Sequence, residues 1–141
     1  MQLWRAGTRP TRPAPAEYFT GTVLQDPIIE SPAPARARAL RVTFLPGGRT
    51  HWHTHTYGQC LHVLSGCGLF QSRGQSPVVI RPGDSLWIPP GEEHWHGAAA
   101  SSVMTHLALQ EADESGQTAR WLEAVSEADY AAAQAATTAA G

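Results

Sequence analysis

The 141-residue chain has little of what membrane, secreted or nucleic-acid-binding proteins contain. No apolar run approaches the roughly 20 residues that cross a bilayer, and the N-terminus lacks the basic region and apolar run of a signal peptide. Only 16% of the residues are charged, the formal net charge is −2, and the arginines form no basic stripe. We therefore expect a soluble cytoplasmic protein that binds neither a membrane nor nucleic acid.

Cysteine is also scarce. Cys60 and Cys67 are too few and too isolated for a disulfide framework, and they lack the companion cysteines of a thiolate metal site. We expect two reduced thiols that pack as small apolar groups.

The residues that are abundant predict a β-fold. The chain has the length of one domain, and its 42% apolar residues suit a globular core. Apolar residues alternate with others from Ala39 onward, and short runs of this kind recur between Gly and Pro turns. The predicted strands are residues 39–45, 59–64, 68–72, 77–80, 85–88, 94–96 and 103–110. Such a series predicts an all-β sandwich or barrel.

The two ends of the chain have different patterns. Residues 1–16 are rich in Pro and Arg and predict an extended arm, and Asp26-Pro27 predicts a turn after a short apolar piece. Residues 117–136 favour a helix, with Trp121 on its apolar face. Residues 126–129 resemble a capping box that starts a second turn of helix. We expect three parts of one domain: an N-terminal arm and edge strand (1–35), a barrel core (36–112) and a helical appendage (113–141).

Histidine is the residue type that points to chemistry. Side chains two residues apart in a strand point to the same face, so His53 and His55 project together, as do His94 and His96. Two such imidazoles and a third from a neighbouring strand form a usual nitrogen set for Zn, Mn, Fe, Ni or Co. A Tyr57-Gly58 turn lets the chain reverse, so that the side-chain carbonyl of Gln59 reaches the same centre. The sequence predicts one divalent metal held by His53, His55, Gln59 and His94.

Two motifs with fixed spacing contain these residues. They are Gly47-x5-His53-x-His55-x3-Gln59-x6-Gly66 and Gly83-x5-Pro89-x-Gly91-x2-His94. Their spacing resembles that of the two cupin motifs, which implies a double-stranded β-helix, also called a jelly-roll barrel. That family usually has Glu at the position of Gln59 and Asn at that of Ala98. The loss of the carboxylate leaves neutral ligands, which make the metal a stronger Lewis acid.

A closer resemblance covers most of the chain. The segments 18–23, 53–55, 66–68, 89–99 and 104–108 are similar to small bacterial cupins that act as manganese-dependent hydroxynitrile lyases. This resemblance implies that Mn(II) binds the three histidines and Gln59, with Fe, Ni, Co and Zn as other candidates. It also implies that a small-molecule cyanohydrin is cleaved to an aldehyde and HCN. Leu40 is bulkier than the small residue expected at its position in the pocket.

The catalytic candidates are His106, His96 and Gln110. His106 and Gln110 share the more polar face of the predicted strand 103–110, which we expect to look into the pocket. We predict that His106 is the base; the alternative for His106 and Gln110 is an internal hydrogen-bonded pair. His96 is either a second base or a barrel residue bonded to a backbone carbonyl.

Other conspicuous side chains have simpler expectations. We expect His51 to be exposed and His62 to face away from the metal. Trp52, Trp87 and Trp95 are expected to pack, with Trp87 a possible wall of a hydrophobic cavity. Arg49 is expected to be solvated or interfacial.

Two other functions use the same ligands. Open positions on Fe or Mn would let a dioxygenase bind O2 and a small alkene or enol, and a non-catalytic cupin would bind a small ligand without turnover. The resemblance and the proline-rich arm also imply a homodimer or a homotetramer.

Overall fold

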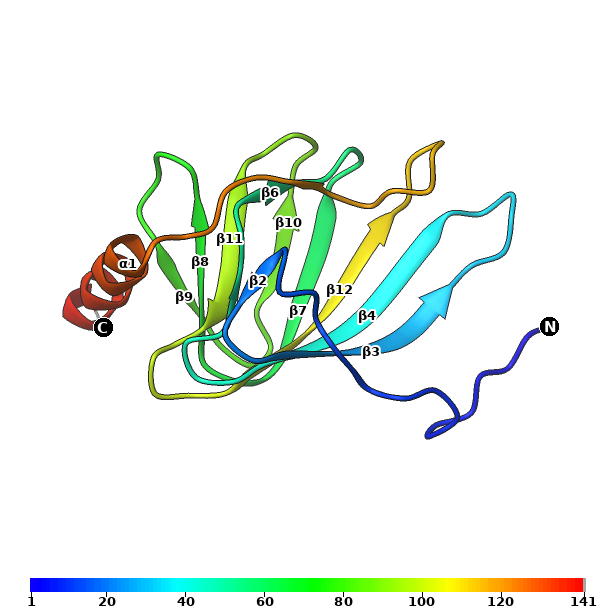
Figure 1. Cartoon of the computed structure of the whole chain (residues 1–141), viewed down its shortest axis with the longest axis horizontal. Helices are drawn as coiled ribbons and strands as arrows, with labels where there is room; N and C mark the ends of the chain where they lie inside the picture. Colours follow the sequence, from blue (N-terminus) through cyan, green and yellow to red (C-terminus); the bar gives the residue numbers. More distant parts are fainter. Residues whose placement is uncertain (141) are drawn as a thin grey trace.

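A computed structural model describes residues 1–140, which form two curled antiparallel sheets and one helix (Figure 1). The strands are β1 (Arg12–Pro13), β2 (Phe19–Thr20), β3 (Val23–Glu30), β4 (Ala37–Phe44), β5 (Arg49–Thr50), β6 (His53–Thr54), β7 (Gln59–Gly66), β8 (Gly68–Ser72), β9 (Val78–Ile80), β10 (Ser85–Ile88), β11 (His94–Ala98), β12 (Met104–Glu111) and β13 (Arg120–Trp121). The helix is α1 (Glu127–Ala140). One sheet has the order β1-β3-β4-β12-β7-β10; the other has the order β13-β6-β11-β5-β2, with β8 between β11 and β9. This is an all-β barrel with a short C-terminal helix, as expected.

The alternating pattern decides which side chains enter the barrel. On β7, Gln59 and Leu61 are buried while Cys60 and His62 are exposed. On β12, the side chains of even-numbered residues are buried, from Met104 to Gln110. Because directly paired residues of antiparallel strands point to the same face, these two strands build one continuous inner wall.

Three clusters of buried apolar side chains stabilise the described part of the chain, the smallest consisting of Leu61, Ile88 and Ala108. The largest cluster, inside the barrel, consists of Phe19, Val23, Val42, Phe44, Val63, Ile80, Ala98 and Met104. A second cluster joins α1 to the outside of the β8–β11 sheet and consists of Trp52, Leu69, Trp95, Val125, Tyr130 and Ala133. Burial of these side chains fixes the helix against the outer face of this sheet, and Figure 1 shows it at the left, beside β8 and β9.

The expected turn at Asp26-Pro27 is wrong. Both residues lie within the eight-residue strand β3, which pairs with β4. The register shifts between Pro27 and Ile29. Proline has no N–H for a ladder hydrogen bond, and a bulge is one of the places where a strand tolerates it.

The expected start of the helix at residue 117 is also wrong. Arg120 and Trp121 form β13, which pairs with β6, and the chain between β12 and α1 crosses one end of the barrel (Figure 1). The capping box is confirmed as the real helix start, because the hydroxyl of Ser126 accepts a hydrogen bond from the N–H of Asp129 at 3.0 Å. Gly141, the end of the expected appendage, lies outside the described residues.

The exposure of Trp87 and that of Arg49 differ from what the sequence predicts. Trp52 and Trp95 pack as expected, but Trp87 is 61% exposed. Arg49 is only 3% exposed, because its guanidinium donates to the carbonyls of Gly47 and Val125, both at 3.1 Å.

No helix in the described part of the chain has the length and apolar character needed to cross a membrane.

Candidate metal centre

The four predicted ligands come from three neighbouring segments of the barrel. His53 of β6 and His94 of β11 are direct partners across the sheet, with ring centroids 4.2 Å apart. The ring of His55 lies 5.0 Å from that of His53 and 5.5 Å from that of His94. Gln59 begins β7 and lines the same cavity as His53 and His55. The structure therefore brings all four side chains to one end of the barrel interior.

Backbone carbonyls fix the orientation of each of the three imidazoles. The Nδ1 atoms of His53, His55 and His94 lie 2.9, 2.6 and 2.9 Å from the carbonyl oxygens of His51, Thr118 and Glu92, respectively. A carbonyl can only accept, so each Nδ1 carries the proton and each Nε2 keeps its lone pair. This arrangement is typical of histidines that bind a metal through Nε2.

The side-chain amide of Gln59 is oriented in the same sense. Its Nε2 donates to Oε1 of Gln110 at 3.0 Å, which leaves Oε1 of Gln59 as a free acceptor. That oxygen and the Nε2 atoms of His55 and His94 are buried and have no hydrogen-bond partner among the described residues. Unpaired buried acceptors cost free energy, and a cation would satisfy all three. The residues present thus fit a divalent metal ion.

His96 lies close to these candidate ligands. One ring nitrogen from each of His53, His94 and His96 falls within 4.8 Å of the other two. This three-histidine cluster could hold a metal ion, so the structure adds His96 to the possible donors.

Burial keeps the imidazoles neutral. Desolvation is the largest cause that lowers the pKa of His94 to about 4, and it also lowers the pKa of His55. The pKa of His53 is well below 6.5, because of desolvation and then of repulsion from His94 and His55. Neutral rings bind a metal without first losing a proton.

A cavity of about 110 Å³ adjoins these residues. Its polar lining includes His96, His106 and Gln110, and Val42 and Phe44 of β4 contribute to its apolar lining. Pockets for drug-sized ligands have volumes of about 300 to 1,000 Å³, so the cavity suits a small molecule or the reacting end of a larger one.

His96 and His106 form a buried pair in the wall of this cavity. Nε2 of His106 lies 3.1 Å from Nδ1 of His96, and the rings are 3% and 0% exposed, respectively. Desolvation lowers the pKa of His106 to about 4 and that of His96 well below 6.5. The other nitrogen of each ring, Nδ1 of His106 and Nε2 of His96, has no hydrogen-bond partner among the described residues. The pair is neutral at pH 7 and has the capacity to accept a proton.

Trp121 is a site residue that sequence reasoning missed. Its ring stacks on His53 at 4.6 Å and on Tyr18 at 4.8 Å between centroids, and it lines the cavity. The helical pattern placed it in an appendage, and no motif marks it. The carbonyl of Thr118, which orients His55, was equally invisible because a backbone acceptor has no sequence signal.

The remaining predicted residues lie outside the centre. His62 is exposed and bonds to Oγ of Ser85 at 2.8 Å, facing away as expected. His51 is half-buried rather than exposed. Both cysteines are free, but Cys60 is exposed, so its expected packing is wrong.

Comparisons with known proteins agree with this architecture. The family model of the cupin domain matches residues 40–109. The (R)-mandelonitrile lyase of Granulicella tundricola is 47% identical over 130 residues, which cover 92% of this chain and 98% of that protein. The chain belongs to the cupin family. Within this family it is similar to a hydroxynitrile lyase.

Solved structures agree with the cupin fold of this chain. A cupin-like protein from Thermotoga maritima is 32% identical, with a TM-score of 0.80 and coverage of 97% of this chain and 98% of that one. The polyketide cyclase RemF from Streptomyces resistomycificus is 20% identical, with a TM-score of 0.67 and coverage of 92% and 90%, respectively. The second likeness concerns the fold alone.

Proposed function

We propose that this cupin is a metal-dependent hydroxynitrile lyase, which cleaves a cyanohydrin into an aldehyde and hydrogen cyanide. The observation that carries the proposal is the placement of three unpaired buried acceptors beside a neutral histidine pair in one small cavity. The 47% identity to a protein named (R)-mandelonitrile lyase supports the same reaction.

The metal in this proposal is one Mn(II) ion per subunit, held by His53, His55, Gln59 and His94. All four donors are neutral, and imidazole and amide oxygen suit several first-row divalent metals, so Fe, Ni, Co and Zn are measured alongside. When bound, the metal supplies a Lewis acid that lowers the pKa of the cyanohydrin hydroxyl. Gln110 accepts a hydrogen bond from Nε2 of Gln59, which leaves Oε1 of Gln59 free to bind the metal ion.

His106 is the proposed general base. In the tautomer that serves this role, Nε2–H of His106 donates to Nδ1 of His96, and Nδ1 of His106 keeps a lone pair. This lone pair accepts the hydroxyl proton, the O–H electron pair forms the carbonyl, and the bond to the nitrile carbon breaks. Cyanide leaves with the electron pair of the broken carbon–carbon bond and takes the proton from His106, which returns the two histidines to their neutral state.

The surrounding side chains keep the reaction dry. Phe44 packs against both rings of the pair, with centroids 5.8 Å from His96 and 5.3 Å from His106. Trp121 covers His53. Exclusion of water strengthens the electrostatic interactions within the cavity.

The test is mandelonitrile cleavage by the purified protein with its metal content measured. The apo form and the Mn(II)-reloaded form are compared, with benzaldehyde followed by absorbance and dissolved oxygen by electrode. We expect benzaldehyde release that is lost in the apo form and restored by Mn(II), without oxygen uptake. Metal binding without aldehyde release would overturn the proposal, and oxygen uptake with substrate would favour a dioxygenase.

A further inference from the structure

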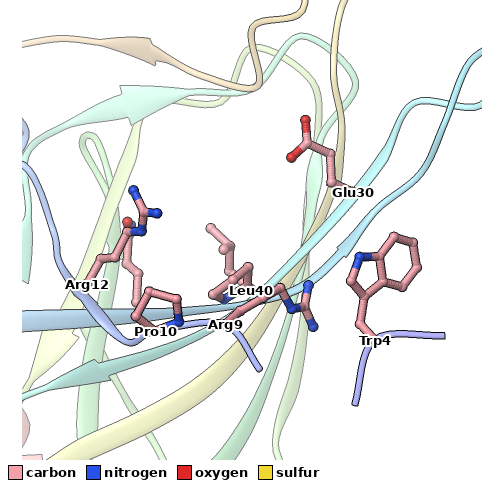
Figure 2. Close-up of a pocket in the computed structure, with 8 residues that line it drawn as sticks. Trp4, Arg9, Pro10, Arg12, Glu30 and Leu40 are labelled. Carbon is pink, nitrogen blue, oxygen red and sulfur yellow. The ribbon is translucent and has the colours of Figure 1, made fainter. Parts of the chain in front are cut away.

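A larger pocket lies outside the barrel cavity, between the N-terminal arm and the strands β3 and β4 (Figure 2). Its volume is about 520 Å³. Its lining includes Trp4, Arg9, Arg12, Gln25, Glu30 and Leu40. We call it the outer pocket.

The arm that forms one side of the outer pocket is anchored along β3. Arg12 in β1 is the direct partner of Gln25 in β3, and the guanidinium of Arg9 donates to the carbonyl of Ile28 at 3.2 Å. These contacts hold the two arginines over the pocket, so the pocket exists before a ligand arrives.

The outer pocket adjoins the catalytic cavity. Gln25 and Leu40 line both. Arg12, Gln25, Val42 and His106 are successive direct partners across β1, β3, β4 and β12. Residues in such a row share one face of the sheet, and three strand spacings of about 4.8 Å place the outer end about 14 Å from His106. The side chains of Arg12 and His106 shorten the distance that a ligand must span between them.

The outer pocket carries unbalanced positive charge. Arg12 has no ion-pair partner among residues 1–140, and the guanidinium of Arg9 lies 5.6 Å from the centre of the Trp4 ring. Glu30 is an acidic group in the lining, and it lies 3.7 Å from Arg38, which lies outside the lining. A guanidinium with free N–H groups pairs with a carboxylate in bidentate fashion.

We infer that the outer pocket binds the anionic end of the substrate, and that Arg12 selects cyanohydrins whose ring or chain carries a carboxylate far from the reacting carbon. The selection of cyanohydrins rests on the proposed lyase function, whereas the binding of a carboxylate in the outer pocket does not. The reacting carbon occupies the 110 Å³ cavity, and the remainder of the molecule extends past Gln25 and Leu40 into the outer pocket.

Binding is tested without turnover. Calorimetry on the metal-loaded protein compares 4-(hydroxymethyl)benzoate with the uncharged 4-methylbenzyl alcohol, in wild type, Arg12→Gln and Arg81→Gln. Arg81 is exposed and lies outside both cavities, which makes it a matched control. We expect the carboxylate to bind about tenfold more tightly than the neutral alcohol in wild type and Arg81→Gln, and this preference to vanish in Arg12→Gln. Equal affinities in wild type, or a preference that survives in Arg12→Gln, would overturn the inference.

Turnover separates this inference from the proposed function. Cyanide addition to 4-formylbenzoate and to benzaldehyde is measured in the same three proteins. The kcat/KM for 4-formylbenzoate divided by that for benzaldehyde is expected to fall about tenfold in Arg12→Gln and to stay unchanged in Arg81→Gln. Preferential binding without turnover of either aldehyde would reject the lyase and keep the anionic subsite. Turnover of both aldehydes with equal kcat/KM in wild type would reject the subsite and keep the lyase.

Discussion

Gln110 orients Gln59: the amide nitrogen of Gln59 donates to Oε1 of Gln110 at 3.0 Å, on the two paired strands β7 and β12. This bond decides which amide atom of Gln59 is left for a cation. Replacement of Gln110 by Leu removes the acceptor, so the amide is free to turn its nitrogen toward the metal. We expect metal affinity to fall about tenfold or more, as for other residues that orient ligands. Competition with a chelator measures it.

Glutamate is the control at this position. Gln110→Glu keeps an acceptor for the same amide nitrogen, so metal affinity is expected to stay close to that of wild type. Tight metal binding by Gln110→Leu would contradict the orienting role of Gln110.

Gln59→Glu tests the value of a neutral ligand. The carboxylate adds negative charge to the donor set, and the side-chain amide of Gln110 is able to rotate and donate to it. We expect tighter metal binding but slower cleavage of mandelonitrile, because a less electron-poor metal polarises the hydroxyl more weakly. Chelator competition and kcat on the fully loaded protein measure the two effects. Equal or faster turnover would show that ligand neutrality is irrelevant to the reaction.

His106→Ala tests the base. The general-base contribution is worth about 10²- to 10⁴-fold, so kcat is expected to fall by that order while the metal stays bound. His62→Ala is the matched control, because His62 is exposed on the outer face of β7. Full activity in His106→Ala would remove His106 from the mechanism and leave His96 as the candidate.

The barrel and the ligand-rich end of it were predictable because both depend on local patterns. The period of two along β7 and β12 assigns Gln59, His106 and Gln110 to the inner face, and the fixed spacing around His53 and His94 identifies paired histidines. The family resemblance added the metal and the reaction, which spacing alone left open among several possibilities.

The remaining features depend on contacts between distant segments. Trp121 reaches His53 only because the chain after β12 crosses the barrel and pairs with β6, although its own neighbours favour a helix. Arg49 is buried because α1 brings Val125 and Glu127 to it from 76 and 78 residues away. Local secondary-structure propensity does not account for contacts between distant segments, and tertiary structure overrides it.

Arg49 anchors the helix to the barrel, and its loss is expected to destabilise the protein. Arg49→Met leaves the carbonyl of Val125 without its donor and removes the guanidinium that lies 4.4 Å from the centre of the Tyr130 ring. We expect a loss of about 3 kcal/mol in the free energy of unfolding, measured with urea. Glu127→Gln, which changes a side chain that is 83% exposed, is expected to cost less than about 1 kcal/mol. Comparable losses in both variants would mean that the ion pair, and not the buried hydrogen bonds, fixes the helix.

The buried histidines make the apo protein sensitive to mild acid. The pKa of His106 is about 4 in the folded state because of desolvation, whereas 6.5 is its ordinary value. Between these values the unfolded state binds more protons, so the free energy of unfolding falls as pH drops below 6.5 and this contribution levels off below about pH 4. At pH 5 the loss from His106 alone is about 2 kcal/mol relative to pH 7. Urea unfolding of the apo protein at both pH values is expected to show at least this loss, since the pKa of His96 is lowered too. His106→Gln is expected to reduce the difference by about 2 kcal/mol, and an unchanged difference would mean that His106 is already protonated or solvated in the folded protein.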